Sequence, residues 1–160
     1  MIRTATPDDL EELYQIERAC FSQNEAATRA QLSERLKIYP NHFILLTKDG
    51  KIVSFINGFV SNKKDLSDEM YENATLHDEN GDWQMIFGVN TLPTHRRNGY
   101  AGMLIEKTVE TAKKEKRLGV VLTCKKQLVS YYSKFGFVDE GISESKHGGE
   151  VWNQMRLTFD

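Results

Sequence analysis

The segment that decides the fold of this chain is Arg96-Arg97-Asn98-Gly99-Tyr100-Ala101, because of its two neighbours. A strand-like run at 83–89 (WQMIFGV) precedes it, and in the residues after it apolar side chains recur at three- and four-residue steps, as in an amphipathic helix. A glycine-bearing turn that opens a helix presents free backbone N–H groups at the positive end of the helix dipole. Such a turn is suited to binding a diphosphate, and Gly99 lets the backbone come close to the ligand.

A second motif, Tyr132-Ser133-Lys134-Phe135-Gly136-Phe137, comes after a further apolar run at 119–124 (GVVLTC). In this order and with these flanks, the two motifs resemble the Arg/Gln-x-x-Gly-x-Gly/Ala and Tyr-x-x-x-Gly-Phe elements of the GNAT superfamily of N-acetyltransferases. The resemblance covers nearly the whole chain and implies an α/β fold, with a central mixed, mostly antiparallel sheet flanked by helices. More narrowly, 21–28 (FSQNEAAT), 124–129 (CKKQLV) and the second motif look like the arylalkylamine (serotonin-type) branch.

The composition is that of an ordinary globular domain, with 39% hydrophobic and 28% charged residues among 160, and we expect a single N-acetyltransferase domain over 1–160. The 21 basic and 23 acidic residues are mixed, so no basic face predicts a nucleic-acid partner. Cys20 and Cys124 lack Cys-x-x-Cys companions, which argues against a zinc site or a disulfide. No apolar run approaches the about 18 residues of a membrane span. We therefore expect a cytoplasmic monomer or homodimer with no metal and no membrane partner.

Strands and helices are expected to interleave along the chain. Thr6-Pro7-Asp8-Asp9 is typical of a helix start, because Thr6 can cap free N–H groups and Pro7 suits the first turn. The other expected elements are a helix from about Ala26 to before Pro40, an antiparallel hairpin of strands 42–47 and 52–60 around the Asp-Gly turn at 48–51, a short helix at 68–72, and a last strand at 151–159.

The resemblance implies that acetyl-coenzyme A is the cosubstrate. Backbone groups at the end of the run 83–89 would pair with the pantetheine arm as if it were another strand, and one N–H there would stabilise the oxyanion; these residues are Val89, Asn90 and Thr91. The pyrophosphate would be held by Arg96, Arg97, Asn98, Gly99, Tyr100, Ala101 and Gly102. Gly88 inside a strand pattern predicts a bulge that opens a slot for the pantetheine. The plainer alternative is that both arginines are solvated surface charges and Gly99 merely serves a turn.

Tyr132 is the residue that the resemblance implies as general acid. A phenol has a pKa of about 10 and a thiol of about 8.5, so a tyrosine beside the sulfur can protonate the departing thiolate. The alternative is a ring packed at a helix end with its hydroxyl in water. Direct attack of the amine is expected, since nothing near Cys124 in the sequence indicates an activated thiolate.

The general base is where the resemblance breaks. The arylalkylamine branch carries two histidines on the strand before the pyrophosphate turn, and the matching residues here are Met85 and Phe87, neither of which accepts a proton. A water relay to a strand carbonyl or to Asp82 or Glu79, or capture of the neutral fraction of a weakly basic amine, are the open routes. The four histidines, for which surface or structural roles are expected because they are isolated and lack metal-ligand spacing, are His42, His77, His95 and His147.

The acceptor is expected to be a primary amine. Residues 65–82 carry seven carboxylates and no lysine or arginine, and the resemblance puts this segment beside the acceptor slot, where it would attract a cation. A solvated polar loop explains the same charges. Candidate acceptor-binding residues are Phe55, Met85, Phe87 and Asp82, although core packing also explains the apolar ones. We expect an arylalkylamine or polyamine-like small molecule; a non-catalytic acyl-CoA binding module and a protein N-terminal or lysine acetyltransferase are the alternatives.

Overall fold

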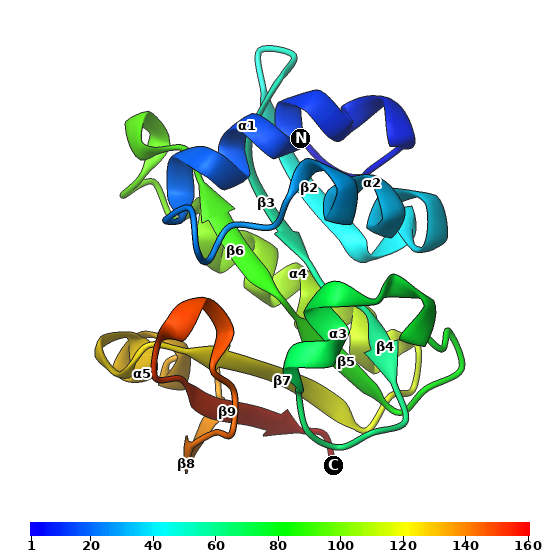
Figure 1. Cartoon of the computed structure of the whole chain (residues 1–160), viewed down its shortest axis with the longest axis vertical. Helices are drawn as coiled ribbons and strands as arrows, with labels where there is room; N and C mark the ends of the chain where they lie inside the picture. Colours follow the sequence, from blue (N-terminus) through cyan, green and yellow to red (C-terminus); the bar gives the residue numbers. More distant parts are fainter.

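The computed structural model describes residues 1–160 and contains two sheets, with the N-terminus on the first and the C-terminus on the second (Figure 1). The first sheet has the order β1 (Ile2–Thr4), β2 (Phe43–Lys48), β3 (Lys51–Asn57), β6 (Gly88–Thr91). The second has the order β4 (Val60–Ser61), β5 (Trp83–Ile86), β7 (Gly119–Cys124), β9 (Asn153–Thr158), β8 (Val138–Ile142). Only β5 and β7 are parallel, so the expected mixed, mostly antiparallel arrangement is confirmed.

Helices cover both faces of the first sheet. The α-helices of the chain are α1 (Leu10–Cys20), α2 (Arg29–Ile38), α3 (Asp68–Glu72), α4 (Tyr100–Lys114) and α5 (Val129–Ser133), of which α1, α2 and α4 cover the first sheet and α5 packs on β8 and β9 of the second. Figure 1 shows α1 and α2 on the near face, with α4 behind the sheets. Along β2, Phe43 and Leu45 pack in the core under α1 and α2, whereas Ile44 and Leu46 pack in the core under α4. This strand is therefore apolar on both faces, as a strand covered on both sides must be. None of the helices combines the length and apolar character needed to cross a membrane.

The hairpin of β2 and β3 is confirmed. Lys48 pairs with Lys51, and the two residues between them, Asp49 and Gly50, have φ of 53° and 78°. Positive φ at both central residues defines the turn whose twist matches that of the flanking strands, and Asp-Gly adopts it at low cost.

Several boundaries differ from those expected. The second helix starts at Arg29 rather than near Ala26, because Thr28 is its N-cap: the Gln31 backbone N–H donates to Thr28 Oγ1 over 3.1 Å. Pro7–Asp9 forms a 3₁₀ turn ahead of α1, and the last strand begins at Asn153. The short helix at 68–72 is confirmed, whereas β1 and β8 have no counterpart among the expected elements.

The two long strands expected at 52–60 and 83–89 are both interrupted, at neighbouring places. β3 ends at Asn57 before β4 begins in the other sheet, and β5 ends at Ile86 before β6 begins in the first sheet. β5 pairs with β7 as far as Ile86 and Leu122, whereas β6 pairs with β3 from Gly88 and Asn57 onward. Between the pairs Asn57–Gly88 and Val60–Gln84 the strand 83–91 has one extra residue, so the irregularity expected at Gly88 is present, and the sheets part between β6 and β7.

Gly58 makes this passage from one sheet to the other possible. The Phe87 N–H donates to the Asn57 carbonyl and the Met85 N–H to the Phe59 carbonyl, both over 2.7 Å. The segments 51–61 and 83–91 therefore stay hydrogen-bonded to each other across the interruption. At Gly58 a Cβ atom would lie 1.7 Å from the Met85 carbonyl oxygen. Only glycine allows such a close approach of two backbones.

We predict that Gly58→Ala destabilises the protein by about 3 kcal/mol or more, because the added methyl group meets backbone that cannot move aside cheaply. For a chain of this length that loss lowers Tm by roughly 6–12 °C. Thermal unfolding measures it. Gly88→Ala is the matched control: its Cβ would be 3.4 Å from the nearest atom, a side-chain amide nitrogen, and we expect a change below about 1 kcal/mol. Equal Tm values for the two variants would contradict the role given to Gly58.

Candidate functional site

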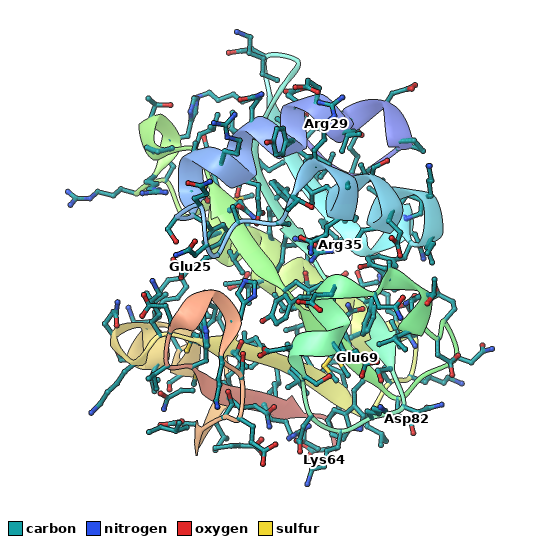
Figure 2. All side chains as sticks on the ribbon, viewed as in Figure 1. Glu25, Arg29, Arg35, Lys64, Glu69 and Asp82 are labelled. Carbon is teal, nitrogen blue, oxygen red and sulfur yellow. The ribbon has the colours of Figure 1, made fainter.

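A cavity of about 430 Å³ lies where β6 parts from β7. Its walls come from α1 and the segment after it, α2, α3, β6, β7, α5 and the loop before β9. Aromatic side chains supply much of the surface, namely Phe21, Tyr71, Phe87, Tyr132 and Trp152. Figure 2 shows Glu25 and Arg35, two of the charged residues of its wall, at the junction between the halves of the molecule. The cavity therefore combines an apolar body with a few polar groups, as small-molecule sites do.

Tyr132 lies at this cavity, and Tyr131 does not. Tyr132 is on α5, which follows the end of β7, and only 8% of it is exposed. Its hydroxyl makes no hydrogen bond within the chain, and its ring packs edge-on against Phe137, 6.2 Å between centroids. Burial raises the pKa of Tyr132, so the phenol stays protonated at neutral pH. A proton donor thus faces the cavity.

Both cysteines line the cavity as thiols. Burial raises the pKa of Cys124 to about 11, and its Sγ lies 3.5 Å from the Met155 sulfur. Burial also raises the pKa of Cys20, whose Sγ donates to the Thr91 carbonyl over 3.3 Å. Because the thiolate is the nucleophilic form, neither is prepared to take an acyl group.

The turn 96–99 is exposed and precedes the 15-residue helix α4. Gly99 has φ of 77° and Arg97 has φ of 67°, a conformation that costs a residue other than glycine about 1–2 kcal/mol. The Asn98 amide donates to the His95 carbonyl over 3.0 Å and holds the turn closed. The first N–H groups of α4 have no partner inside the helix. The turn is therefore shaped to offer backbone donors and the positive end of α4 to an anion.

The two sequence motifs meet in space. A Cβ at Gly102, in the first turn of α4, would lie 3.2 Å from the ring of Phe135, which follows α5. The helix that opens at the turn thus packs against the segment that carries Tyr132. The turn and the cavity belong to one continuous region of the molecule.

Of the three residues expected along the pantetheine, Val89 lines the cavity, whereas Asn90 and Thr91 continue β6 beyond it. The Asn90 carbonyl accepts from Ser54 Oγ over 2.7 Å, and the Thr91 carbonyl accepts from Arg96 Nε over 3.1 Å. β6 is the last strand of its sheet, so its edge toward β7 carries no neighbouring strand.

Among the expected acceptor-binding residues, only Phe87 lines the cavity. Phe55 and Met85 are fully buried in the core instead, since their strand faces turn toward the cluster under α1 and α2. Asp82 is exposed just before β5, and Figure 2 shows it at the other side of the molecule from Glu25. The structure does not bring these three residues to the cavity.

The acidic segment 65–82 does not supply carboxylates to the cavity either; Tyr71 is its one contribution. Its acidic groups bind within the fold: Asp65 pairs with Arg156 over 2.7 Å, and Asp68 accepts from the Lys146 backbone N–H over 2.9 Å. Asp78 accepts from the Asn62 amide over 3.1 Å. The expected attraction of a cationic acceptor by this segment therefore has no support in the geometry.

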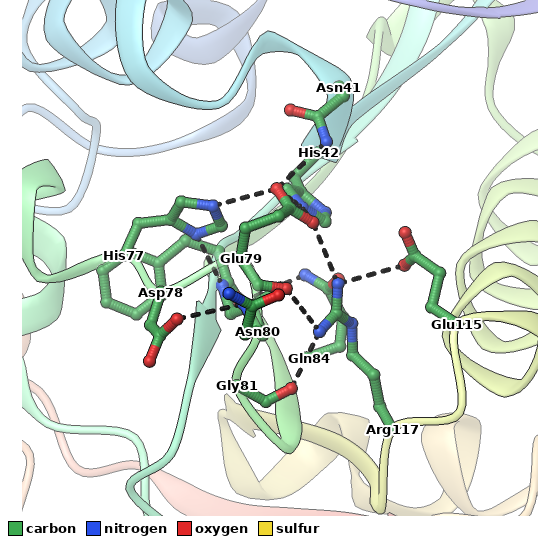
Figure 3. A network of polar contacts seen from close by, with 12 residues as sticks. Asn41, His42, His77, Asp78, Glu79, Asn80, Gly81, Gln84, Glu115 and Arg117 are labelled. Carbon is green, nitrogen blue, oxygen red and sulfur yellow. Dashed lines mark hydrogen bonds and ion pairs between the residues drawn. The ribbon is translucent and has the colours of Figure 1, made fainter.

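Two histidines expected to be isolated form a cluster with Glu79 (Figure 3). Glu79 lies 3.0 Å from His42 Nε2, 3.1 Å from His77 Nε2 and 3.0 Å from an Arg117 guanidinium nitrogen. The Val60 N–H donates to His77 Nδ1, so His77 carries its proton on Nε2 and gives it to Glu79. Burial lowers the pKa of His77, in keeping with a neutral ring. The carboxylate joins the start of β2 to the end of α4, a structural task.

We predict a stability contribution from Glu79 that acid removes. Burial alone raises the pKa of this carboxyl, but the His42 charge and hydrogen bonds from Asn41, His42 and His77 outweigh it and lower the pKa to about 2. The contribution is complete above the ordinary value near 4.5 and is lost as the pH falls through about 2. Urea unfolding should give Glu79→Gln a smaller free energy of unfolding than the parent at pH 7. This difference in free energy should narrow below pH 4.5. Glu106→Gln, on the exposed face of α4, is the control. A difference in the free energy of unfolding that does not change with pH would contradict the lowered pKa of Glu79.

The acidic and basic residues of the cavity were not among the expected site residues: they are Glu17, Glu25, Arg35, Lys125 and His147. Glu17 lies four residues after the buried Leu13, and Arg35 lies three residues after the buried Leu32. This spacing predicts both on the apolar faces of their helices, so the sequence could have indicated them. Both are nearly buried, and Glu17 Oε1 has no hydrogen-bond partner. His147 and Glu25 come from irregular segments, where no periodicity marks the inward side.

The comparison with protein families accounts for these features together. Residues 10–137 match the model of the acetyltransferase (GNAT) family. The chain belongs to the GNAT acetyltransferase family. It is therefore an acetyl-CoA-dependent N-acetyltransferase, and the cosubstrate expected from the two motifs is confirmed by family membership.

Individual GNAT proteins are similar to this chain at low sequence identity. It is 27% identical over 161 residues to serotonin N-acetyltransferase of Mesocricetus auratus, covering 98% of this chain and 76% of that protein. The loading GNATL domain of CurA from Lyngbya majuscula superimposes with a TM-score of 0.85 at 17% identity, covering 99% and 96% of the two chains. The GphF GNAT-like decarboxylase in complex with isobutyryl-CoA gives 0.83 at 20% identity, covering 99% and 98%. At such identities the two structures show the fold alone.

We predict that Gly99→Asp weakens acetyl-CoA binding roughly 10- to 100-fold relative to Gly99→Asn, because a carboxylate placed at an anion site costs a few kcal/mol. The pair is matched, since both side chains tolerate positive φ and a Cβ at this position has no atom within 4 Å. Calorimetric titration measures both dissociation constants. Equal affinities in the two folded variants would remove the turn from the pyrophosphate site.

Proposed function

We propose that this GNAT protein transfers the acetyl group of acetyl-CoA to the primary amine of a small molecule with an aromatic or apolar body, such as an arylalkylamine. The observation that carries the proposal is the parting of β6 from β7, which leaves one cavity lined by residues of β6, by Tyr132 and by further aromatic side chains. The likeness to a serotonin N-acetyltransferase supports the same acceptor class.

The donor would bind along β6 and the turn. The unpaired edge of β6 at Val89, Asn90 and Thr91 suits a pantetheine arm that pairs like a strand, although its Asn90 and Thr91 carbonyls already accept bonds from side chains. Backbone N–H groups from Arg97 to Gly102 suit the pyrophosphate, with the Arg96 and Arg97 side chains adding positive charge.

The lining of the cavity favours an acceptor with one amine on an aromatic body over a polyamine. A polyamine needs several free anionic partners, whereas the cavity wall has two carboxyl groups and one of them, Glu25, is paired with Lys125 over 2.8 Å. The Phe87 ring centroid lies 5.0 Å from that of Tyr71, with 42° between the ring planes, and 4.9 Å from the Arg35 guanidinium carbon, so aromatic rings supply part of the wall.

Tyr132 would be the general acid of a direct transfer. Tyr132 lines the cavity and its phenol stays protonated, so a proton is available for the departing thiolate. Direct attack is favoured because burial keeps the Cys124 thiol protonated, which leaves the cavity without an activated sulfur nucleophile.

Thiol release tests the function, with 2-phenylethylamine, spermidine and a peptide with a free N-terminus as acceptors and acetyl-CoA affinity measured in parallel. We expect the largest kcat/KM for the arylalkylamine. The peptide as the best acceptor would support a protein N-terminal acetyltransferase instead. Tight binding of acetyl-CoA with no thiol released for any amine would support a non-catalytic acyl-CoA binding module and overturn the proposal.

We predict that Tyr132→Phe lowers kcat roughly 10- to 10³-fold with little change in acetyl-CoA affinity, since the ring is kept and the proton donor is lost. Tyr131→Phe is the neighbouring control and should stay near the parent rate. Because burial raises the Tyr132 pKa, the parent should show no alkaline loss of kcat below about pH 10 from this phenol. Full turnover by Tyr132→Phe would exclude Tyr132 as the acid.

A further inference from the structure

His147 enters the cavity from the loop between β8 and β9. Its ring lies parallel to that of Tyr71, with 4.4 Å between centroids and 11° between planes, and 6.0 Å from the ring of Trp152. The Trp152 indole N–H donates to the His147 carbonyl over 2.8 Å. Contacts from α3 and from its own loop therefore fix the position of the imidazole.

A single hydrogen bond fixes the tautomer of His147. Its Nε2 lies 2.8 Å from the backbone carbonyl oxygen of Glu25. A carbonyl oxygen only accepts, so Nε2 carries the proton and donates it. In the neutral ring the lone pair then resides on Nδ1, and no group of the chain hydrogen-bonds to that nitrogen. Orientation of an imidazole by an acceptor on one nitrogen is how proteins prepare the other nitrogen for chemistry.

The contact between this loop and the segment 24–25 is closely fitted. Gly148, with φ of 63°, follows His147, and a Cβ there would lie 2.7 Å from Glu25 Cγ and 3.1 Å from the Asn24 carbonyl oxygen. Glycine at 148 thus lets the loop approach near enough for the bond from Nε2 to form. The placement of the imidazole depends on backbone geometry at both partners.

We propose that His147 is the general base of the transfer, taking a proton from the acceptor amine at Nδ1. The inference rests on the proposed function and fills its missing step. An ammonium acceptor gives one proton to Nδ1, and the freed nitrogen lone pair forms the C–N bond to the thioester carbonyl carbon. The C–S bond breaks, Tyr132 protonates the sulfur, and the second nitrogen proton returns to Tyr132, directly or through water. His147 releases its proton to solvent, so one proton is liberated for each amide and thiol formed.

The charged and titratable groups around His147 leave it the best base of the cavity. Glu25 pairs with Lys125 and Ser22; burial opposes this by raising its pKa, but the Lys125 and Ser22 hydrogen bonds lower it overall, which makes the carboxylate a weak acceptor of protons. Tyr71 keeps its proton, because burial raises its pKa to about 12. Arg35 is a cation. Glu17 is the rival, since burial raises the pKa of its carboxyl and its Oε1 is free.

The test compares His147→Gln with Glu17→Gln, using 2-phenylethylamine and O-benzylhydroxylamine as acceptors. The two acceptors have nearly the same shape, but the alkoxyamine is uncharged at pH 7 and needs no initial deprotonation. We expect His147→Gln to lower kcat/KM for 2-phenylethylamine about 10²- to 10³-fold and to leave the kcat/KM for the alkoxyamine within a few-fold of the parent value. Acetyl-CoA affinity should be unchanged. Glu144→Gln, exposed on the same loop, is the control.

Chemical rescue separates a base from a packing role. Imidazole added to His147→Ala should restore much of the rate with 2-phenylethylamine and should not restore Tyr132→Phe. Equal losses of kcat/KM for both acceptors, no rescue by imidazole, or a larger loss in Glu17→Gln that is confined to 2-phenylethylamine, would each overturn the assignment to His147. A parent that releases no thiol with any amine fails the proposed function itself, whereas an active parent with an unimpaired His147→Gln fails this inference alone.

Discussion

The rest of the structure depends on the close approach of the backbone at Gly58 to the carbonyl of Met85. The segments 51–61 and 83–91 stay paired with each other across this point, and both pass from one sheet into the other. If β5 and β6 formed one straight strand, the edge that faces β7 would be closed along its whole length. Because the strand instead loses β7 as a neighbour after Ile86, the sheets separate and a cavity forms that is lined by β6 and by Tyr132.

The chemistry assigned to this cavity follows from which polar groups are already engaged. Carboxylates of the acidic segment bind arginine, histidine and backbone partners, so they hold the scaffold rather than the acceptor. The cavity's polar groups without a hydrogen-bond partner include the buried phenol of Tyr132, Nδ1 of His147 and Oε1 of Glu17. The His147 imidazole is held by the Glu25 carbonyl, which is distant in the sequence. A proton donor and a proton acceptor in the lining of one cavity are what transfer from a thioester to an amine requires.

Features set by neighbours in sequence could be predicted, and features set by partners far along the chain could not. The Asp-Gly turn, the helix at 68–72 and the glycine turn before α4 each carry their own local signal. Whether Phe55 and Met85 point into the core or into the cavity depends on strand register. Both faces of these strands carry apolar residues, so the sequence does not distinguish the two directions. His147 is bonded to a residue 122 positions away, in an irregular loop, so no spacing rule marked it.

The most direct test of the account is amide hydrogen exchange with and without acetyl-CoA, because the central claim concerns where the donor meets the backbone. The account predicts slower exchange along β6, residues 88–91, and in the first turn of α4, residues 100–102, with β1 and the β2–β3 turn unchanged. Protection confined to other segments, with exchange at 88–91 and 100–102 unaltered at saturating acetyl-CoA, would contradict it.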